Sequence, residues 1–330
     1  MTPRTVRLAA ALFLAALAGS ARAHHGSAAV SFIGAEGPGA AIDTTTALPL
    51  GEGTALALAK TEYVPFQQRE GFVDQKTYSS FNTLALGYGI RPWLSAFVFQ
   101  PYNVKAQDGV GTNRGLGDTN VMLAAAFKWD EGLRLAPEKE SLDDLRDWHF
   151  SVWGSCTIPV GPTDHVDDRG DFFAPDMQTG FRGPSPAGGV TVLKQVSDDF
   201  TLLGEVNYQY FFDQSYTEAG IRYQFGAETR VNGAVAWRAY ASGRTRIDLA
   251  PELVLLNLQR DRQDGAALRA SGGTILYGQV GVRGTFGPVS VGAAVKRAVA
   301  TRLNEASEQQ GVEGLEVFRA ALVVGYATRL

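Results

Sequence analysis

The sequence has almost no cysteine, because Cys156 is the single one among 330 residues. An intramolecular disulfide is therefore excluded, and with it the disulfide framework of small secreted domains. Histidine is nearly as scarce, and only His149 and His165 lie beyond the amino-terminal region. Neither histidine stands near a recognisable nucleophile motif, so we expect no enzyme activity and no cofactor.

Basic charge is not in excess either, since 30 Lys and Arg face 34 Asp and Glu, a formal charge of −4. This balance gives no reason to expect a nucleic-acid partner. Charged residues make up 19% of the chain and are mixed in sign, which argues against a disordered polyelectrolyte. No segment beyond the amino terminus reaches the roughly 18 consecutive apolar residues that a transmembrane helix requires.

The amino terminus has the pattern of a secretory signal peptide. Arg4 and Arg7 precede an apolar run over residues 8–17, and the small-x-small triplet Ala21, Arg22, Ala23 follows. The apolar run is too short to span a bilayer, so we expect cleavage rather than a retained anchor. Residues 1–23 are the predicted signal peptide, the mature chain begins at His24, and its formal charge is −7. No cysteine stands at the cleavage point, so no lipid anchor is expected there.

The full sequence is rich in glycine, with 38 residues, and in aromatics, at 10%. Long alternations of apolar and polar residues are bounded by turn residues. Each is two to three times as long as a usual strand of roughly 5 to 6 residues, and a tilted strand needs about 9 to 11 residues to cross a bilayer. The alternation predicts twelve strands, over residues 53–66, 77–90, 94–107, 117–130, 148–162, 187–197, 200–214, 224–241, 245–260, 272–286, 288–302 and 315–329.

The connections alternate between tight and long. Tight connections lie at 90–94, 197–200, 241–245 and 286–288, and most of those between them are long. Transmembrane barrels combine short periplasmic turns with long outer loops in this way. One connection, 131–147, is long where a periplasmic turn is expected, and its segment SLDDLRD predicts a short capped helix. The fold class is therefore all-β: a single transmembrane antiparallel up-and-down β-barrel of about twelve strands, formed by residues 53–330.

The pair Asn232-Gly233 is a strong hairpin signal that conflicts with this count. A turn there would create a thirteenth strand and would place the turn near Ser242-Gly243 on the wrong side. We therefore predict one continuous strand through the pair.

Alternation alone does not tell which face meets lipid, because a soluble β-sandwich shows the same period of two. In the sandwich, the charges would form the solvated outside. Strand length and the signal peptide favour a barrel whose apolar face meets lipid, with aromatic rings at the strand ends. Segments 53–66, 187–197 and 245–260 are apolar on both faces, which leaves their orientation open. The lipid assignment predicts a solvated pore lined by Lys128, Glu205, Asn207, Gln209, Glu228, Arg230, Asn232, Arg238, Gln279, Arg283, Lys296 and Arg319.

Four segments resemble an outer-membrane transporter family named for the meta-pathway of phenol degradation, itself distantly similar to long-chain fatty acid transporters. They are GLGDTNVMLAAAFKW from Gly115, TIPVGPTD from Thr157, YQFGAETRVNGAVAW from Tyr223 and SGGTILYGQVGVRGTF from Ser271. The resemblance covers about residues 40–330. It implies a barrel of twelve to fourteen strands that moves small, often hydrophobic or aromatic, molecules across the outer membrane. It implies no catalytic residues.

Two groups of residues suggest metal binding. His24 and His25 follow the cleavage site, where a free amino terminus beside imidazoles chelates copper, nickel or zinc, or else they are polar residues of a mobile terminus. Carboxylates gather at 164–176 in the longest outer loop, as a cation site or as a solvated acidic loop without the twelfth-position Glu of a calcium loop. Residues 24–52 form either a plug inside the lumen or a periplasmic tail.

We therefore expect an outer-membrane channel or transporter for a small solute, hydrophobic or aromatic according to the resemblance. The alternatives are a secreted or outer-membrane metal-binding protein that uses His24 and His25, and a non-transporting structural or adhesive barrel. The expected partners are outer-membrane lipid and lipopolysaccharide, the small-molecule solute and the barrel-assembly machinery. That machinery reads a terminal alternation such as the one that ends here at Leu330, although a terminal aromatic residue is the usual form.

Overall fold

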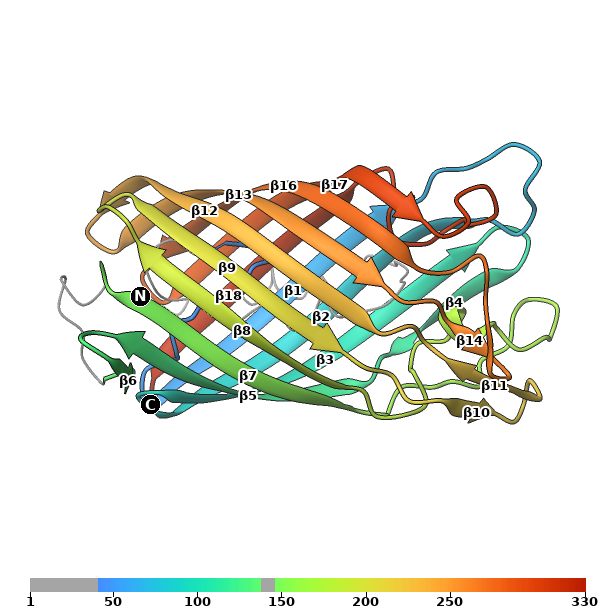
Figure 1. Cartoon of the computed structure of the whole chain (residues 1–330), viewed down its shortest axis with the longest axis horizontal. Coiled ribbons are helices and arrows are strands. Elements are labelled where there is room, and N and C mark those ends of the chain that lie inside the picture. Colours follow the sequence, from blue (N-terminus) through green and yellow to red (C-terminus); the bar gives the residue numbers. More distant parts are fainter. Residues whose placement is uncertain (1–40, 138–145) are drawn as a thin grey trace, which may run out of the picture.

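A computed structural model describes residues 41–137 and 146–330, and an antiparallel β-barrel dominates it (Figure 1). The wall contains twelve long strands, as the alternation predicts. They are β1 (Thr54–Pro65), β2 (Lys76–Arg91), β3 (Leu94–Gln107), β5 (Thr119–Trp129), β7 (Trp148–Ile158), β8 (Pro186–Gln195), β9 (Phe200–Gln209), β12 (Glu228–Ser242), β13 (Thr245–Leu258), β16 (Gly273–Phe286), β17 (Val289–Leu303) and β18 (Arg319–Arg329).

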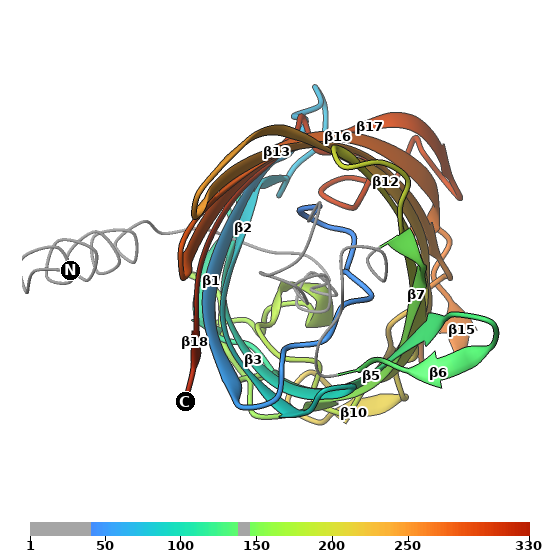
Figure 2. The same cartoon turned by 90° about the vertical axis from the view of Figure 1, so that its left-hand side faces the viewer.

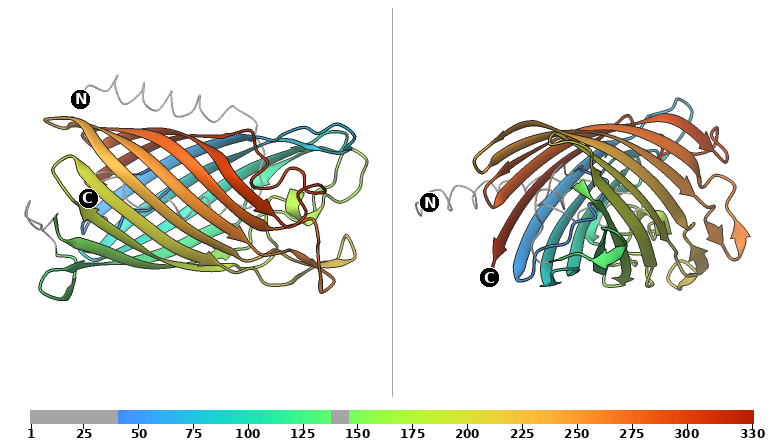
Figure 3. Two further views of the ribbon diagram at one scale, coloured as in Figure 1. Left: turned by 45° about the horizontal axis from the view of Figure 1, so that its top comes forward. Right: turned by 60° about the vertical axis from the view of Figure 1, so that its left-hand side comes forward.

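The wall closes without a free edge. Neighbouring strands pair antiparallel in the order β3-β2-β1-β18-β17-β16-β13-β12-β9-β8-β7-β5, and β3 also pairs with β5. Two short strands, β4 (Gly111–Leu116) and β6 (Leu133–Leu135), extend β3 and β5 as hairpins. Figure 3 shows the tilt of the strands around the barrel axis. Closure satisfies the backbone hydrogen bonds that an open sheet would leave exposed at its edges.

The outer face of the wall is apolar. Exposed large apolar side chains lie along it in every part of the barrel, for example Leu86, Leu123, Leu253, Val280 and Val295. Aromatic residues stand near the strand ends: Trp129 pairs in register with Trp148, and the rings of Phe200 and Trp237 stack at 6.4 Å. This arrangement matches a hydrocarbon band with interfacial aromatic girdles.

The tight connections all lie at one end of the barrel, which we take as the periplasmic end. Gly243 and Gly287 adopt positive φ there, which the short turns require. The strand β12 runs straight through Asn232-Gly233, so the predicted continuous strand is confirmed. It instead carries an irregularity between Arg238 and Tyr240. Most of the helix expected in 141–147 lies outside the described residues.

The long connections lie at the opposite, outer end, except the one between β5 and β7, which contains β6 and lies at the periplasmic end. Four wall strands are at least four residues shorter at the outer end than the alternation predicts: β7 ends at Ile158, β18 begins at Arg319, β9 ends at Gln209 and β12 begins at Glu228. The intervening β10 (Gln214–Tyr216) and β11 (Ile221–Gln224) join β14 (Arg262–Gln263) and β15 (Ala266–Ala267) in a separate small sheet. That sheet buries an aromatic cluster that includes Tyr216 and Tyr223. Its residues therefore alternate between buried and exposed positions, as those of the wall do. Among the described residues, no helix is long and apolar enough to cross a membrane.

Candidate functional site in the barrel lumen

Residues 41–50, here called the lumen segment, lie inside the barrel. Figure 2 looks along the barrel and shows this blue stretch crossing the space that the strands enclose. The segment reaches three parts of the wall: Leu50 donates its N–H to Ser95 of β3, Thr45 contacts Thr191 of β8, and Ile42 bonds to Glu252 of β13. It therefore spans the cross-section rather than following one strand.

Two buried carboxylates bind the backbone of the lumen segment. The Glu252 carboxylate accepts the N–H groups of Ile42 at 2.7 Å and Thr44 at 2.8 Å, and that of Asp43 at 3.2 Å. The Thr44 hydroxyl adds a further hydrogen bond at 2.8 Å. Glu205 accepts the N–H of Thr45 at 2.9 Å. Hydrogen bonds to an ionised acceptor each contribute about 1.5 to 3 kcal/mol, so these contacts hold the segment firmly.

Charge also holds the segment. The Asp43 carboxylate lies 3.0 Å from Lys60 Nζ of β1 and forms a second ion pair with Lys296 of β17. Arg283 of β16 donates to the Ala41 carbonyl at 2.8 Å. A buried charge is tolerated only when it is paired and hydrogen-bonded, and Asp43 meets both conditions through basic residues on two wall strands.

A second charge layer lies next to this one, towards the outer end. Glu62 lies 3.5 Å from Lys60 and 3.3 Å from Arg319, so it links the two layers. Arg319 also binds Glu316 at 2.6 Å, and Glu316 accepts the Tyr277 hydroxyl at 2.8 Å. The inner wall therefore carries both signs of charge at mid-barrel.

Inward-facing glycines create the space that the lumen segment fills. A Cβ atom on Gly281 would lie 2.6 Å from Ile42 Cγ1, and one on Gly292 would lie 2.8 Å from Ile42 Cδ1. At the other end of the segment, a Cβ on Gly89 would collide with the Leu50 and Gly51 carbonyls. Glycine at these positions lets an additional chain pack directly against the wall.

This packing gives a testable prediction. Gly281→Val should displace Ile42, because overpacking a close contact costs about 1 to 3 kcal/mol, and ion flux through reconstituted protein should rise about three- to tenfold. The matched control is Gly233→Val on β12, where a Cβ meets no atom within 4 Å. A fall in flux with Gly281→Val, as expected if the valine merely narrowed the lumen, would contradict this packing.

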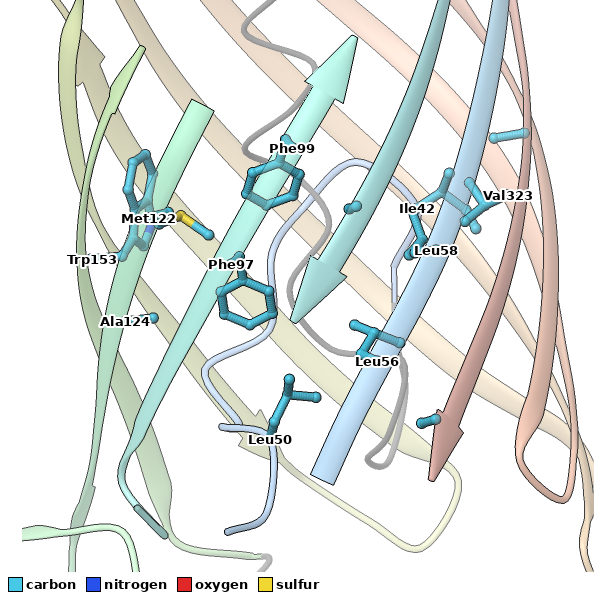
Figure 4. Packing of buried hydrophobic residues seen from close by; sticks show 13 residues of the cluster. Ile42, Leu50, Leu56, Leu58, Phe97, Phe99, Met122, Ala124, Trp153 and Val323 are labelled. Atoms are coloured by element: carbon cyan, nitrogen blue, oxygen red, sulfur yellow. The ribbon is translucent and has the colours of Figure 1, made fainter. Parts of the chain in front are cut away.

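One side of the inner wall is apolar, which the sequence did not predict. Leu56, Leu58, Phe97, Phe99 and Trp153 point inward beside Ile42 and Leu50 of the lumen segment (Figure 4). The rings of Phe97 and Phe99 stack at 6.1 Å. The opposite side, from β9 to β17, carries most of the inward charges, together with smaller apolar clusters that include Leu203, Val254 and Ile275. The lumen is therefore amphipathic, with its apolar strip on β1, β3, β5 and β7.

A loop between β7 and β8 covers the outer end of the lumen. Carbonyls of its short helix η4 (Pro175–Met177) accept hydrogen bonds from inward side chains of β3 and β4. Lys105 donates to the Asp176 carbonyl at 2.8 Å, and Asn113 donates to the Met177 carbonyl at 2.9 Å. In Figure 2 this turn lies within the ring of strands. The loop therefore narrows the mouth above the lumen segment.

Asp118 fastens the base of the same loop to the rim. Its carboxylate accepts the N–H groups of Gly161 at 2.8 Å and Phe181 at 2.7 Å. Burial raises the pKa of Asp118 to about 6, although these two donors and Lys105 act in the opposite direction.

The side chains predicted to line the pore all lie on the inner side of the wall, buried or half-buried. The Glu205 carboxylate accepts hydrogen bonds from the side-chain amides of Asn207 and Asn232. Glu228 forms an ion pair with Arg230 at 3.2 Å. Gln279 donates to Glu252, while Gln209 donates to Ser185. Four contact the lumen segment or its charge layers: Glu205, Arg283, Lys296 and Arg319. Lys128, which binds Asp147, and Arg238 stand apart near the periplasmic end.

Glu252, Asp43, Lys60 and Glu62 are central to the site and were missed by sequence reasoning. Glu252 shares its inward face with Ala250, Val254 and Leu256, so no polar stripe marks it. Lys60 and Glu62 do alternate in β1, but Leu56 and Leu58 precede them on the same face. A register taken from β12, which pairs Ala234 with Glu252, would have placed Glu252 inward.

The closed wall, the apolar outer face and the filled lumen together define the type of fold. It is similar to that of a known outer membrane channel. The structure "Crystal structure of the COG4313 outer membrane channel from Pseudomonas putida F1" aligns with a TM-score of 0.65 and 12% sequence identity, over 87% of this chain and 100% of that one. The NanC porin aligns with a TM-score of 0.45 at 11% identity, over 83% of this chain and 99% of that one. No family model matches the sequence, and no curated protein matches it.

The candidate metal ligands His24 and His25 lie outside the described residues. Within residues 41–137 and 146–330, no group of three or more His, Cys, Asp or Glu is arranged to hold a metal ion. In the acidic outer loop, Asp167 accepts the N–H groups of Arg169 and Asp171, and Arg169 binds Asp74 at 2.9 Å. Asp167 in this loop and Asp74 in the β1–β2 connection therefore have partners within the protein.

Proposed function

We propose that this protein is an outer-membrane channel for a small, hydrophobic or aromatic solute, and that the lumen segment is its removable plug. The observation that carries the proposal is the amphipathic lumen, in which an apolar strip faces a charged wall across a chain segment held by side-chain carboxylates and ion pairs. Residues 41–50 precede β1 and belong to no strand, so their displacement would leave the strand pairing of the wall intact.

The solute class follows from what the plug covers. If residues 41–50 left the lumen, Leu56, Leu58, Phe97, Phe99 and Trp153 would face water along one side. An apolar strip of this kind lets a small ring or alkyl chain bury its apolar surface away from water. The charged side chains on the opposite side of the lumen keep the rest of the path hydrated. The resemblance to the transporter family of phenol degradation supports the same class. The predicted pore-lining side chains, including Glu228, Arg230 and Arg238, would form the wet side of this path.

The pore-lining proposal is tested by ion selectivity in planar bilayers. The protein should conduct, and Arg230→Glu combined with Arg283→Glu should move the reversal potential towards cation selectivity, because two inward positive charges become negative. Arg230→Glu alone serves as a second variant, since Arg230 binds Glu228 and Arg283 also holds Ala41. Arg297→Glu, an exposed position of β17, is the matched control and should leave selectivity unchanged.

Two results would count against the proposal. Protein that folds and inserts but neither conducts nor takes up solute would be a structural barrel. Ion selectivity that is unchanged in both inward charge-reversal variants would mean that these side chains do not face the path. To test the solute class, phenol should reduce the ion current by occupying the apolar strip, whereas glycerol at the same concentration should not.

A further inference from the structure

A separate cavity lies at the outer end, above the lumen, where four connections meet. It has a volume of about 270 Å³. Its lining comes from the η4 turn of the β7–β8 loop, from Tyr223 and Gly226 of the β9–β12 connection, from the β13–β16 connection and from the β17–β18 connection. An apolar cavity of about 150 Å³ holds benzene, so this volume suits a molecule with one ring and a short side chain.

The lining is divided into an apolar and an acidic part. Leu258, Leu268, Leu303, Val312 and Pro175 supply the apolar part. The carboxyl-bearing residues Asp176, Asp261 and Glu313 supply the acidic part. Among the described residues that line the cavity, none is Lys, Arg or His. The basic partners Lys76 of Asp176 and Arg319 of Glu313 lie behind the lining, not in it.

The hydrogen-bond donors of the lining are largely used within the protein. The Tyr223 hydroxyl donates to Asp261 at 2.7 Å, the Ser271 hydroxyl to the Leu268 carbonyl at 2.8 Å, and the Gln309 amide to the Gly272 carbonyl at 3.1 Å. Carboxylates accept about four hydrogen bonds each, and Asp261 receives two here, from Tyr223 and from the Gly226 N–H. The cavity therefore offers acceptors and negative charge to a ligand, and its remaining side-chain donors are the uncharged amides of Gln259 and Gln263.

We propose that this cavity binds a small amphipathic amine, with the ring or alkyl body against the leucines and the ammonium group towards Asp176, Asp261 and Glu313. An ammonium group supplies three donors and a positive charge, which is what the lining lacks. A carboxylate-bearing ligand of the same size would meet three acidic residues and find few donors. The site adds to the proposed function by naming a ligand class at the outer mouth, where capture would precede passage.

The test measures phenethylammonium binding to the full chain, purified in detergent, by isothermal titration calorimetry. Ala270→Trp fills the cavity and should weaken binding at least tenfold, whereas Ala267→Trp, on the nearby exposed β15, should not change it. Glu313→Gln should weaken binding about fivefold. Phenylacetate, of similar size and opposite charge, should bind the wild-type protein at least tenfold more weakly than phenethylammonium. Heat-modifiable migration on gels confirms that each variant is folded.

Equal binding of phenylacetate and phenethylammonium would overturn the proposal, and so would an affinity that Ala270→Trp leaves unchanged. The binding measurement requires no flux, so its failure is distinct from failure of the channel proposal. A barrel that binds phenethylammonium without conducting would retain this site and lose the proposed function. If the barrel conducts but Ala270→Trp does not change its affinity for phenethylammonium, the channel proposal stands and the proposed cavity site is wrong.

Discussion

Oxidation of a Thr45→Cys, Thr191→Cys double variant should reduce ion flux at least tenfold, and reduction should restore it. The two hydroxyl oxygens lie 3.1 Å apart, one on the lumen segment and one on β8, so a disulfide between the replacement thiols needs only a small movement. A covalent bond at the middle of the segment would hold it across the lumen. Flux should fall because passage requires the segment to leave.

This prediction is measured by salt efflux from liposomes, in a Cys156→Ser background that removes the native thiol. The Thr45→Cys single variant controls for loss of the hydroxyl and for thiol chemistry, and should not respond to oxidant. Mass spectrometry establishes that the bond has formed. Unchanged flux through fully cross-linked protein would mean that solute passes beside the segment, and that residues 41–50 are a fixed part of the wall.

Removal of the main carboxylate that holds the segment should have the opposite effect. Glu252→Ala leaves the N–H groups of Ile42, Asp43 and Thr44 without their acceptor, and a displaced segment satisfies them with water. The loss of even two of these charge-assisted hydrogen bonds, about 3 kcal/mol at about 1.5 kcal/mol each, would raise the open fraction about a hundredfold, since about 1.4 kcal/mol corresponds to a factor of ten. We expect conductance to rise at least tenfold, because flux saturates once most channels are open.

Glu228→Ala provides the matched control for this variant. Glu228 is also a buried carboxylate on the inner wall, on the neighbouring β12, but its ion pair is with Arg230 and not with the lumen segment. Both variants remove one inward negative charge, so an effect of pore charge alone would appear in both. Similar conductance of Glu252→Ala and Glu228→Ala would contradict the role given to Glu252.

The barrel was predictable from sequence because a lipid-facing wall imposes a strict alternation over long strands. The predicted bounds of the strand at 94–107 match β3 without error, and the decision to continue through Asn232-Gly233 rested on the same regularity. The ends of β9 and β12 were misplaced because the small outer sheet of β10 and β11 continues the alternation beyond the wall. Local periodicity does not distinguish a strand that stays in the wall from one that turns out of it.

The site was only partly predictable, for a different physical reason. Polar residues that alternate with lipid-facing ones, such as Glu205 and Arg230, were found because only their own strand is needed to place them. Glu252 and the apolar strip of Phe97, Phe99 and Trp153 were missed because their role depends on a second chain segment inside the barrel. Nothing local in the sequence of residues 41–50 shows which wall strands they contact, since those partners lie up to 253 positions away, as Lys296 does from Asp43.

Single-channel recording of the cross-linkable Thr45→Cys, Thr191→Cys protein tests the central claim most directly, because the same channel is observed closed and then released. The account predicts a silent oxidised channel that begins to conduct after reductant is added to the chamber, and that closes again on reoxidation. Steady conductance of equal size in both redox states, from protein proven to carry the disulfide, would show that the lumen segment does not control passage.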